Sequence, residues 1–519
     1  MKKITSSLKS ISLYLFLIMY ALILIVDIGF QWMDYCCKKN VVLPNIFIFL
    51  LVGFAFWGLI ALIGKKKDSI EKKLEKSDKI IAILTVGLFF VQVLITYCII
   101  FRTSWDAGIV TAQARLVAQH SDEVWSDYYS KHPNNLFITF LYSFFYGIAG
   151  KFGDDSYGVI LIAIFQCLLS TLAVYLVYRV MRKICDGRLL PVGSWIVAVL
   201  WVGMSPWKII PYSDSFGIIF PIFIVWIYQS LQKNKLTVIK CISIGMITAL
   251  GYKIKPSIVI VFIAIMILEV FKLISNEHKK ETIGKMSILA LSLVLTVGGV
   301  GCFDMVGYMN IDYDKEAACG MTHFLMVGFR EDTNGIYNPE DEEFSVSFAT
   351  RKERSKANLL EVKRRIQEFG VLGLIKHSTK KSLSNFNDGT FTWGWDGDFY
   401  AGIISEPDPV LSPVLRSFYY DDGKLNFLFV LIMQFWWLFV IVGMLLNVVD
   451  VIKQHEISDE KFLLLLSIIG LTIFVMLFEG RARYLYLYSP IYVIVGALGI
   501  KSFYEKIVIK DKAEEGKIK

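Results

Sequence analysis

The hydrophobic and polar positions of this chain fall into long blocks, and short alternating patterns are rare. Apolar runs recur from one end to the other, most of them at or above the roughly 17 residues needed to cross a hydrocarbon core about 30 Å thick. They predict about twelve transmembrane crossings. These lie at 12–33, 44–64, 80–101, 157–178, 189–205, 215–231, 237–252, 256–274, 286–308, 425–449, 461–479 and 484–502.

The basic residues between these runs predict the orientation. Lysines crowd the segment 65–79, further Lys and Arg residues follow in alternate loops, and six lysines lie after residue 500. Cytoplasmic loops carry an excess of Lys and Arg, so this pattern places both termini in the cytoplasm of a multi-pass cell-membrane protein. The net charge of +8 mostly reflects this bias and gives no reason to invoke nucleic acid.

One apolar segment, 135–150, would break the parity of the crossings if it spanned the membrane. At about 16 residues it is at the lower limit for a span, so we interpret it as a juxtamembrane or half-inserted helix. Two long segments then face outward, 102–156 and 309–424. In the second, residues 355–369 predict an amphipathic helix that stops at Gly370, followed by a helix at 371–386 lying on the membrane surface.

The resulting fold class is an all-α polytopic membrane protein with about twelve transmembrane helices, juxtamembrane helices and an extracytoplasmic loop subdomain. We divide the chain into five parts: a two-helix extension with a basic cytoplasmic loop (1–79), a transmembrane core with the first outer loop (80–308), the outer subdomain (309–424), the C-terminal helices (425–502) and a cytoplasmic tail (503–519).

Motif searching excludes several classes of chemistry. The eight cysteines show no CxxC or metal-ligand spacing. The chain contains no GxGxxG, Walker or HExxH motif, so nothing in the sequence supports a nucleotide motor or a zinc hydrolase. No cofactor is indicated, and the predicted site includes no metal, although a divalent metal stays an open alternative.

The most informative polar position is Asp106, just outside the third crossing and next to Trp105. A carboxylate at a helix start can simply cap the helix. The functional alternative is a general base, which needs an ionised carboxylate within hydrogen-bond reach of a hydroxyl.

Cations gather on the same predicted outer side. Lys131 and His132 precede Pro133, Lys255 precedes the eighth crossing, and Arg481 and Arg483 precede the last. Because short outer loops normally avoid Lys and Arg, basic residues at this height indicate an anionic ligand such as a lipid phosphate. The alternatives are a snorkelling lysine and an internal ion pair, for example Glu479 with Arg483.

Aromatic and acidic residues on that side are candidates for holding a sugar, because indole faces stack on C–H groups while carboxylates accept from hydroxyls. We select Trp105, Tyr129, Asp214, Asp388, Trp393 and Trp395 as candidate substrate-binding residues. An interfacial aromatic belt explains either late tryptophan equally well, and Asp214 can instead cap a helix.

Four features together resemble the GT-C superfamily of membrane glycosyltransferases over roughly residues 80–500. They are Asp106 in the first outer loop, the KHPNN segment that opens the next helix, an outward Lys255-Pro256 pair, and a late Glu-x-Arg-x-Arg-Tyr segment. The resemblance is nearest to the bacterial branch related to protein O-mannosyltransferases and the lipid A aminoarabinose transferase. The chain departs from it by two extra helices in front and by lacking an acidic pair at the site.

The resemblance implies a sugar donor linked to a polyprenyl phosphate, which in a bacterium would be undecaprenyl phosphate, and transfer to a cell-wall polymer, glycolipid or protein outside the membrane. It also implies that Asp106 is the base and that Lys131, His132, Lys255, Arg481 and Arg483 face the donor phosphate. Two alternative functions remain open: a flippase or transporter of lipid-linked sugars, and a polysaccharide polymerase or ligase. We see no internal repeat that would favour a transporter.

Overall fold

The computed structural model describes residues 2–31, 43–64, 66–231, 237–276, 278–303, 305–395, 399–404 and 408–501. Nearly all of the regular structure in these residues is helical. Eight helices are long and apolar enough to cross a membrane: Lys3–Gly29, Ser77–Ile99, Asp155–Ile184, Thr237–Ile254, Pro256–Ile274, Lys279–Cys302, Asn426–Gln454 and Asp459–Leu477. They belong to the elements α1 (Lys2–Gly29), α4 (Ser77–Ile99), α8 (Gly158–Ile184), α12 (Thr237–Ile254), α13 (Val259–Ile274), α14 (Lys279–Cys302), α20 (Asn426–Gln454) and α21 (Asp459–Leu477).

The other four predicted crossings coincide with shorter apolar helices, Asn45–Leu59, Leu189–Gly203, Ser213–Tyr228 and Ser489–Lys501. The first lies in α2 (Asn45–Gly64); the second comprises α9 (Leu189–Val197) and a π-helical turn, Ala198–Gly203; the third comprises α10 (Ser213–Gly217) and α11 (Ile219–Tyr228). The last follows α22 (Arg483–Tyr486), and Pro490 stands at its start. Proline there has no N–H to donate, which favours a helix beginning at that point.

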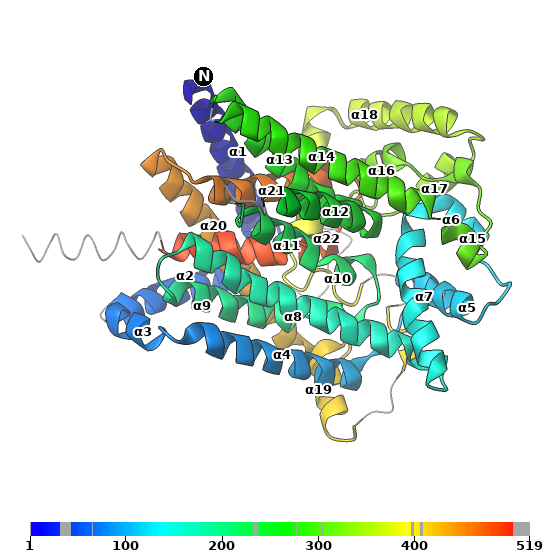
Figure 1. Ribbon diagram of the computed structural model, residues 1–519, viewed down its shortest axis with the longest axis horizontal. Helices are drawn as coiled ribbons and strands as arrows, with labels where there is room; N and C mark the ends of the chain where they lie inside the picture. Colours follow the sequence, from blue (N-terminus) through cyan, green and yellow to red (C-terminus); the bar gives the residue numbers. More distant parts are fainter. Residues whose placement is uncertain are drawn as a thin grey trace, which may run out of the picture.

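The helix predicted at 135–150 is present as α7, Leu136–Lys151. In Figure 1 it runs across the end of α4 and α8 rather than alongside them. Around it lie α5 (Asp106–Ala118), α6 (Ser126–Lys131), α15 (Met305–Met309) and α17 (Pro339–Val346), whereas α3 (Lys67–Lys73) lies at the opposite end of α4 (Figure 1). The two predicted outer segments therefore occupy one end of the helix bundle.

A two-stranded sheet joins the two outer segments. The strand β1 (Phe101–Arg102) pairs antiparallel with β2 (Gly402–Ile403), with Phe101 opposite Ile403. Two flanking backbone bonds extend the ladder, from Ala401 N to Arg102 O at 2.8 Å and from Ile404 N to Ile100 O at 3.3 Å. The large outer segment is thus fastened directly to the end of α4.

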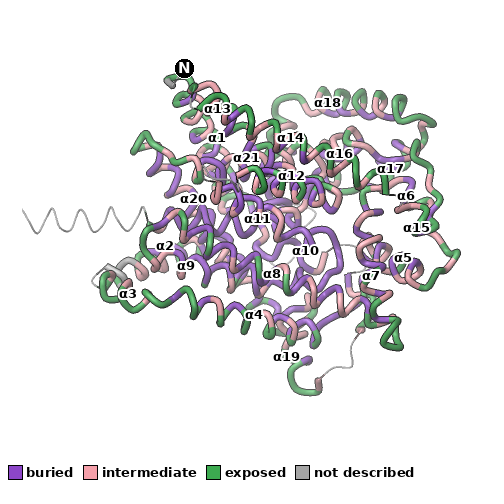
Figure 2. The backbone as a smooth tube through the Cα atoms, in the orientation of Figure 1, coloured by how far each residue is buried: buried purple, intermediate pink, exposed green. Residues whose placement is uncertain are grey.

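The predicted amphipathic helix and its stop are confirmed in α18 (Arg351–Phe386), which begins at a Thr350–Glu353 capping box and breaks at Gly370. Gly370 has a φ of 55°, a left-handed value that glycine adopts without a Cβ clash. In Figure 2 the first half is largely exposed. The prediction that 371–386 lies on the membrane surface is wrong for its last turn. Residues 381–386 are buried, and the indole of Trp437 donates to the carbonyl oxygen of Phe386 inside the bundle.

The predicted orientation can be tested by labelling a single cysteine in the outer subdomain. Asn338 is a poor position, since it is 8% exposed and its side chain caps α17. Glu368 on α18 has a 59% exposed side chain and suits the purpose. We expect Glu368→Cys in intact cells to react with a membrane-impermeant maleimide above the level of the parent protein. Reaction only after the inner face has been opened would contradict the orientation.

Candidate active site

Asp106 is the first residue of α5 and lies at the predicted outer end of the bundle. The N-cap position belongs to Trp105, and no side chain caps this helix end by a hydrogen bond. The Asp106 carboxylate instead accepts a hydrogen bond at its Oδ2 from the Tyr212 hydroxyl, at 3.0 Å. Among the described residues its Oδ1 has no hydrogen-bond partner, and the side chain is only partly buried. One oxygen of Asp106 is therefore held in place while the other is available to a ligand.

Gly108 explains how the chain turns so tightly into α5. A Cβ at this position would lie 1.9 Å from the Thr103 carbonyl oxygen, so only glycine fits there. The negative charge of Asp106 also lies at a helix N-terminus, where the helix dipole stabilises an anion by about 0.3–1 kcal/mol. The tight turn therefore holds the Asp106 carboxylate close to the end of α4.

Tyr212 links Asp106 to the aromatic and cationic part of the site. Its ring packs edge-on against Trp105, with centroids 5.0 Å apart, and it lies in the break between the π-helical turn of the fifth apolar run and α10. Its hydroxyl also lies 3.4 Å from Asn135 Oδ1. Tyr212 was not among the candidate residues predicted from the sequence, although it lies two positions before the candidate Asp214.

Arg483 lies against Trp105 and Tyr212, the two aromatic residues beside Asp106. Its side chain is buried, and its guanidinium carbon lies over the ring of Trp105 at 4.7 Å and near those of Tyr484 and Tyr212 at 5.5 and 5.7 Å. Its Nε lies 3.9 Å from Asp214 Oδ2. A guanidinium held between aromatic faces keeps its charge and a fixed orientation, which suits recognition of a phosphate.

Lys255 and Asp214 form a buried ion pair beside Arg483. The Lys255 ammonium bonds to Asp214 Oδ1 and lies over the Tyr484 ring at 4.0 Å. Asp214 is fully buried and reaches both cations, so its carboxylate compensates buried positive charge. Asp214 thus faces two cations, Lys255 and Arg483.

Lys131 and His132 form a second group of basic residues. Glu342, in the predicted outer subdomain, contacts both of them. Lys131 Nζ lies 2.8 Å from Glu342 Oε1, and His132 Nε2 lies 3.2 Å from Glu342 Oε2. The Tyr337 hydroxyl lies 3.3 Å from the same Oε2. Burial raises the pKa of Glu342, but the hydrogen bonds from His132 and Lys131 outweigh it and lower the pKa to about 2.

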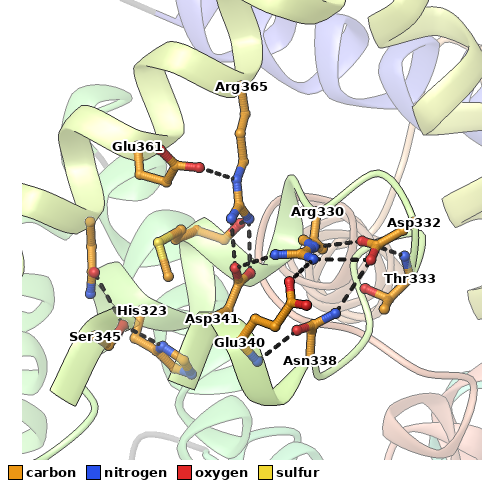
Figure 3. A network of polar contacts seen from close by, with 12 residues as sticks. His323, Arg330, Asp332, Thr333, Asn338, Glu340, Asp341, Ser345, Glu361 and Arg365 are labelled. Carbon is orange, nitrogen blue, oxygen red and sulfur yellow. Dashed lines mark hydrogen bonds and ion pairs between the residues drawn. The ribbon is translucent and has the colours of Figure 1, made fainter. Parts of the chain in front are cut away.

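A network of ion pairs fixes the position of α17, which carries Glu342. Asp341, the neighbour of Glu342, accepts from Arg365 of α18 at 2.6 and 2.8 Å and from Arg330 at 3.1 Å (Figure 3). Arg330 also pairs with Asp332 and Glu340, and these hydrogen bonds raise the pKa of its guanidinium. The preceding helix, α16 (Met321–Gly328), joins the network because Met326 O accepts from Arg365 at 2.9 Å. These ion pairs hold α17 in place, and α17 in turn positions the Glu342 carboxylate beside Lys131 and His132.

Glu479 lies between the two cationic groups. Burial raises the pKa of its carboxyl, Arg483 lowers it, and the negative charge of Asp106 raises it. His132 and Lys255 act on the same carboxyl, so both groups and Asp106 lie within electrostatic range of this one residue. Arg483 Nε lies 3.9 Å from Asp214 Oδ2, and Glu479 accepts from the Tyr484 hydroxyl at 3.5 Å.

Several predicted substrate-binding residues are engaged in contacts of their own. The Tyr129 hydroxyl contacts Thr139 Oγ1 at 2.7 Å and is fully buried. Asp388 accepts from the backbone N–H groups of Thr390 and Thr392, and the Trp393 indole donates to Tyr419 O at 2.7 Å within an aromatic group beside β1. Trp395 is partly buried two residues further on, and Arg481 is partly buried two residues before Arg483.

Metal-ligating residues do not gather in the part of the chain that the structure describes. No group of three or more His, Cys, Asp or Glu side chains there has the geometry to hold an ion. The chemistry of the cluster is that of several carboxylates, a tyrosine hydroxyl and several cations.

These observations define an all-α polytopic membrane protein with a polar cluster at one end of its helices. The chain belongs to a family described as conserved hypothetical integral membrane protein, whose sequence model matches residues 1–503. No curated protein sequence matches it.

Two solved structures show a distant likeness. One is the archaeal oligosaccharyltransferase AglB from Archaeoglobus fulgidus in complex with an inhibitory peptide and a dolichol-phosphate, at a TM-score of 0.39 and 13% identity, covering 83% of this chain and 52% of that one. The other is the Archaeoglobus fulgidus oligosaccharyltransferase tethered to an acceptor peptide, at a TM-score of 0.40 and 14% identity, covering 82% and 50%. The present chain thus spans about half the length of these structures.

Proposed function

We propose that this protein is an inverting glycosyltransferase that moves a sugar from a polyprenyl-phosphate donor to an acceptor hydroxyl outside the membrane. The observation that carries the proposal is the placement of Asp106: one oxygen is held by Tyr212, the other is available, and Arg483 is stacked on the intervening Trp105. Asp106, the proposed base for the acceptor, and Arg483, the proposed cation for the leaving phosphate, thus lie on either side of Trp105.

The proposed step balances as a single displacement. Asp106 takes the proton of the acceptor hydroxyl, and the acceptor oxygen forms a bond to the anomeric carbon. The bond from that carbon to the phosphate oxygen breaks, and its electron pair leaves with the polyprenyl phosphate. Arg483 and Lys255 stabilise the added charge on the phosphate. Attack opposite the leaving group inverts the anomeric configuration.

The decisive assay is transfer of a labelled sugar from a synthetic polyprenyl-phosphate donor by the purified protein. Formation of a glycosylated acceptor together with free polyprenyl phosphate is the expected result. Movement of labelled lipid-linked sugar between the leaflets of reconstituted vesicles, with no glycoside formed, would establish the flippase alternative and overturn the proposal. Acceptance only of diphosphate-linked oligosaccharides would identify a polymerase or ligase.

Glu342 offers a prediction about the second cationic group. Its carboxylate occupies Lys131 and His132 as a phosphate would, so we expect Glu342→Gln to tighten donor binding several-fold by removing a competing anion. Titration of donor into detergent-purified protein measures this. The control is Glu368→Gln, a surface substitution on α18. Weaker donor binding by a well-folded Glu342→Gln protein would show that Glu342 orders the site instead.

The pH dependence of this contact follows from the lowered pKa of Glu342. A carboxyl whose pKa falls on folding stabilises the fold fully above its unfolded value, about 4.3 for glutamate, and loses that contribution as the pH falls through the folded value. With a folded pKa of about 2, the Glu342 charge persists from pH 8 to pH 5. We therefore expect the ratio of donor affinities of Glu342→Gln and wild type to change little between pH 8 and pH 7.

A further inference from the structure

The short helix α19 (Leu411–Tyr419) has a burial pattern opposite to that of a helix that faces water. Its Ser412 is fully buried, whereas Leu411 and Val414 are 43% and 55% exposed. Val410, just before the helix, is 72% exposed. A helix at a water-facing surface buries its apolar residues and exposes its polar ones. The exposed side of the first turn of α19 therefore indicates an apolar environment.

The helix α19 is fastened to the end of α4. Arg416 is the only charged residue in the sequence of α19, and its Nε donates to the Cys98 carbonyl oxygen at 3.1 Å. The Tyr420 hydroxyl, one residue beyond the helix, donates to the Ile99 carbonyl oxygen at 2.9 Å. The last carbonyl groups of a helix have no partner within that helix, so these two bonds satisfy acceptors of α4 and fix α19 beside its end.

The length of α4 sets the depth of α19 in the membrane. With 23 residues, α4 is about 34 Å long at 1.5 Å per residue, close to the roughly 30 Å of hydrocarbon that it is predicted to cross. Its end at Ile99 therefore lies near the boundary between hydrocarbon and headgroups. Figure 1 shows α4 between α8 and α19, and Figure 2 shows an exposed turn of α19 at the edge of the molecule. This turn thus extends sideways from the bundle at the depth of that boundary.

The exposed turn continues a surface of α4 that is itself predicted to face lipid. Phe90, Leu94 and Tyr97 of α4 are exposed, and their spacing of four and three residues places them on one face of that helix. The opposite side of α4 packs against α8, where Gln92 accepts from the Thr171 hydroxyl at 2.9 Å. Because the exposed face lies within a predicted crossing, lipid covers it. The same lipid is the nearest apolar medium for the first turn of α19.

We propose that the first turn of α19 inserts into the outer leaflet of the membrane, with Val410, Leu411 and Val414 at the boundary between headgroups and acyl chains. Apolar side chains on one side of a short helix bind a membrane surface in this way. The strand β2 precedes α19 in the chain, so the inserted turn anchors this end of the outer segment to the membrane. The inference is independent of the proposed glycosyl transfer.

Photo-crosslinking of the full-length protein in native membranes identifies what surrounds the turn. The photoreactive residue benzoylphenylalanine replaces Val414, and in a control protein it replaces Glu340, an exposed residue of α17. We expect irradiation to attach phospholipid to the peptide that contains position 414 and not to the peptide that contains position 340. A cross-link from position 414 to another polypeptide or to a second copy of this chain, or the absence of a lipid adduct there, would overturn the proposal.

Cysteine labelling measures the same environment independently. Val414→Cys and Val410→Cys are compared with Glu368→Cys in opened membrane vesicles, where a water-soluble maleimide reaches both faces, and the labelling of the parent protein is subtracted. The thiolate is the reactive form and is disfavoured in apolar surroundings, so we expect the two α19 variants to react roughly tenfold more slowly than Glu368→Cys. The difference should disappear once the proteins are unfolded. Equal rates in the vesicles would show that the turn faces water and would contradict the inserted position.

Discussion

Replacing Asp106 with asparagine is expected to lower turnover by about 10²–10⁴-fold, the usual contribution of a general base. Asparagine has the size of aspartate and still accepts the hydrogen bond from Tyr212, but it cannot take a proton at neutral pH. The cations that are proposed to hold the donor are unchanged in this variant. Donor binding should therefore persist while transfer of the labelled sugar fails.

The same substitution distinguishes catalysis from helix capping. Asparagine caps a helix about as well as aspartate, so a capping role predicts normal turnover. The structure already argues against a side-chain cap, because the Asp106 carboxylate bonds to Tyr212 and Trp105 holds the N-cap position. Asp127→Asn is the matched control: it is an exposed carboxylate in the first turn of α6, in the same outer segment. Wild-type turnover by the Asp106→Asn protein would exclude Asp106 as the base.

The hydrophobic pattern was sufficient to locate the helices of the membrane bundle. Each predicted crossing has an apolar helix in the structure, because burial in hydrocarbon imposes one simple requirement on sequence and backbone alike. The pattern could not show where helices break. The π-helical turn Ala198–Gly203 is as apolar as its surroundings, and the segment 204–212 that follows it brings Tyr212 and Asp214 to the site.

The sequence did not predict which carboxylates pair with the candidate cations. Lys131 and Glu342 are 211 positions apart, and Asp214 lies in α10 whereas Lys255 follows α12. Local spacing carries no signal for such pairs, since they depend on how distant segments of the chain pack together. Unusual positive charge on the outer side identified the cations, while their carboxylate partners had no comparable signal. Local composition also singled out Asp388 and Trp393, and both are hydrogen-bonded to protein backbone: Asp388 accepts from Thr390 N, and the Trp393 indole donates to Tyr419 O.

Arg483 is expected to contribute most to donor affinity. Removing a hydrogen bond to a charged group costs about 1.5–3 kcal/mol, so Arg483→Ala should weaken donor binding by roughly 10- to 150-fold. Turnover at saturating donor should also fall, because the leaving phosphate loses a stabilising cation. Titration of donor into the purified variant measures the first effect, and the transfer assay at high donor concentration measures the second.

Two further variants separate the role of Arg483 in binding from its role in packing. The guanidinium lies over Trp105 and near Tyr212, so its loss also removes cation–π contacts worth about 0.5–2 kcal/mol. Arg483→Lys keeps the charge but not the planar fork, and should therefore bind donor with intermediate affinity. Arg364→Ala, on the exposed face of α18, should leave donor affinity unchanged. Unchanged donor affinity in a folded Arg483→Ala protein would remove Arg483 from the phosphate site and leave Lys255, beside Asp214, as the buried cation to test.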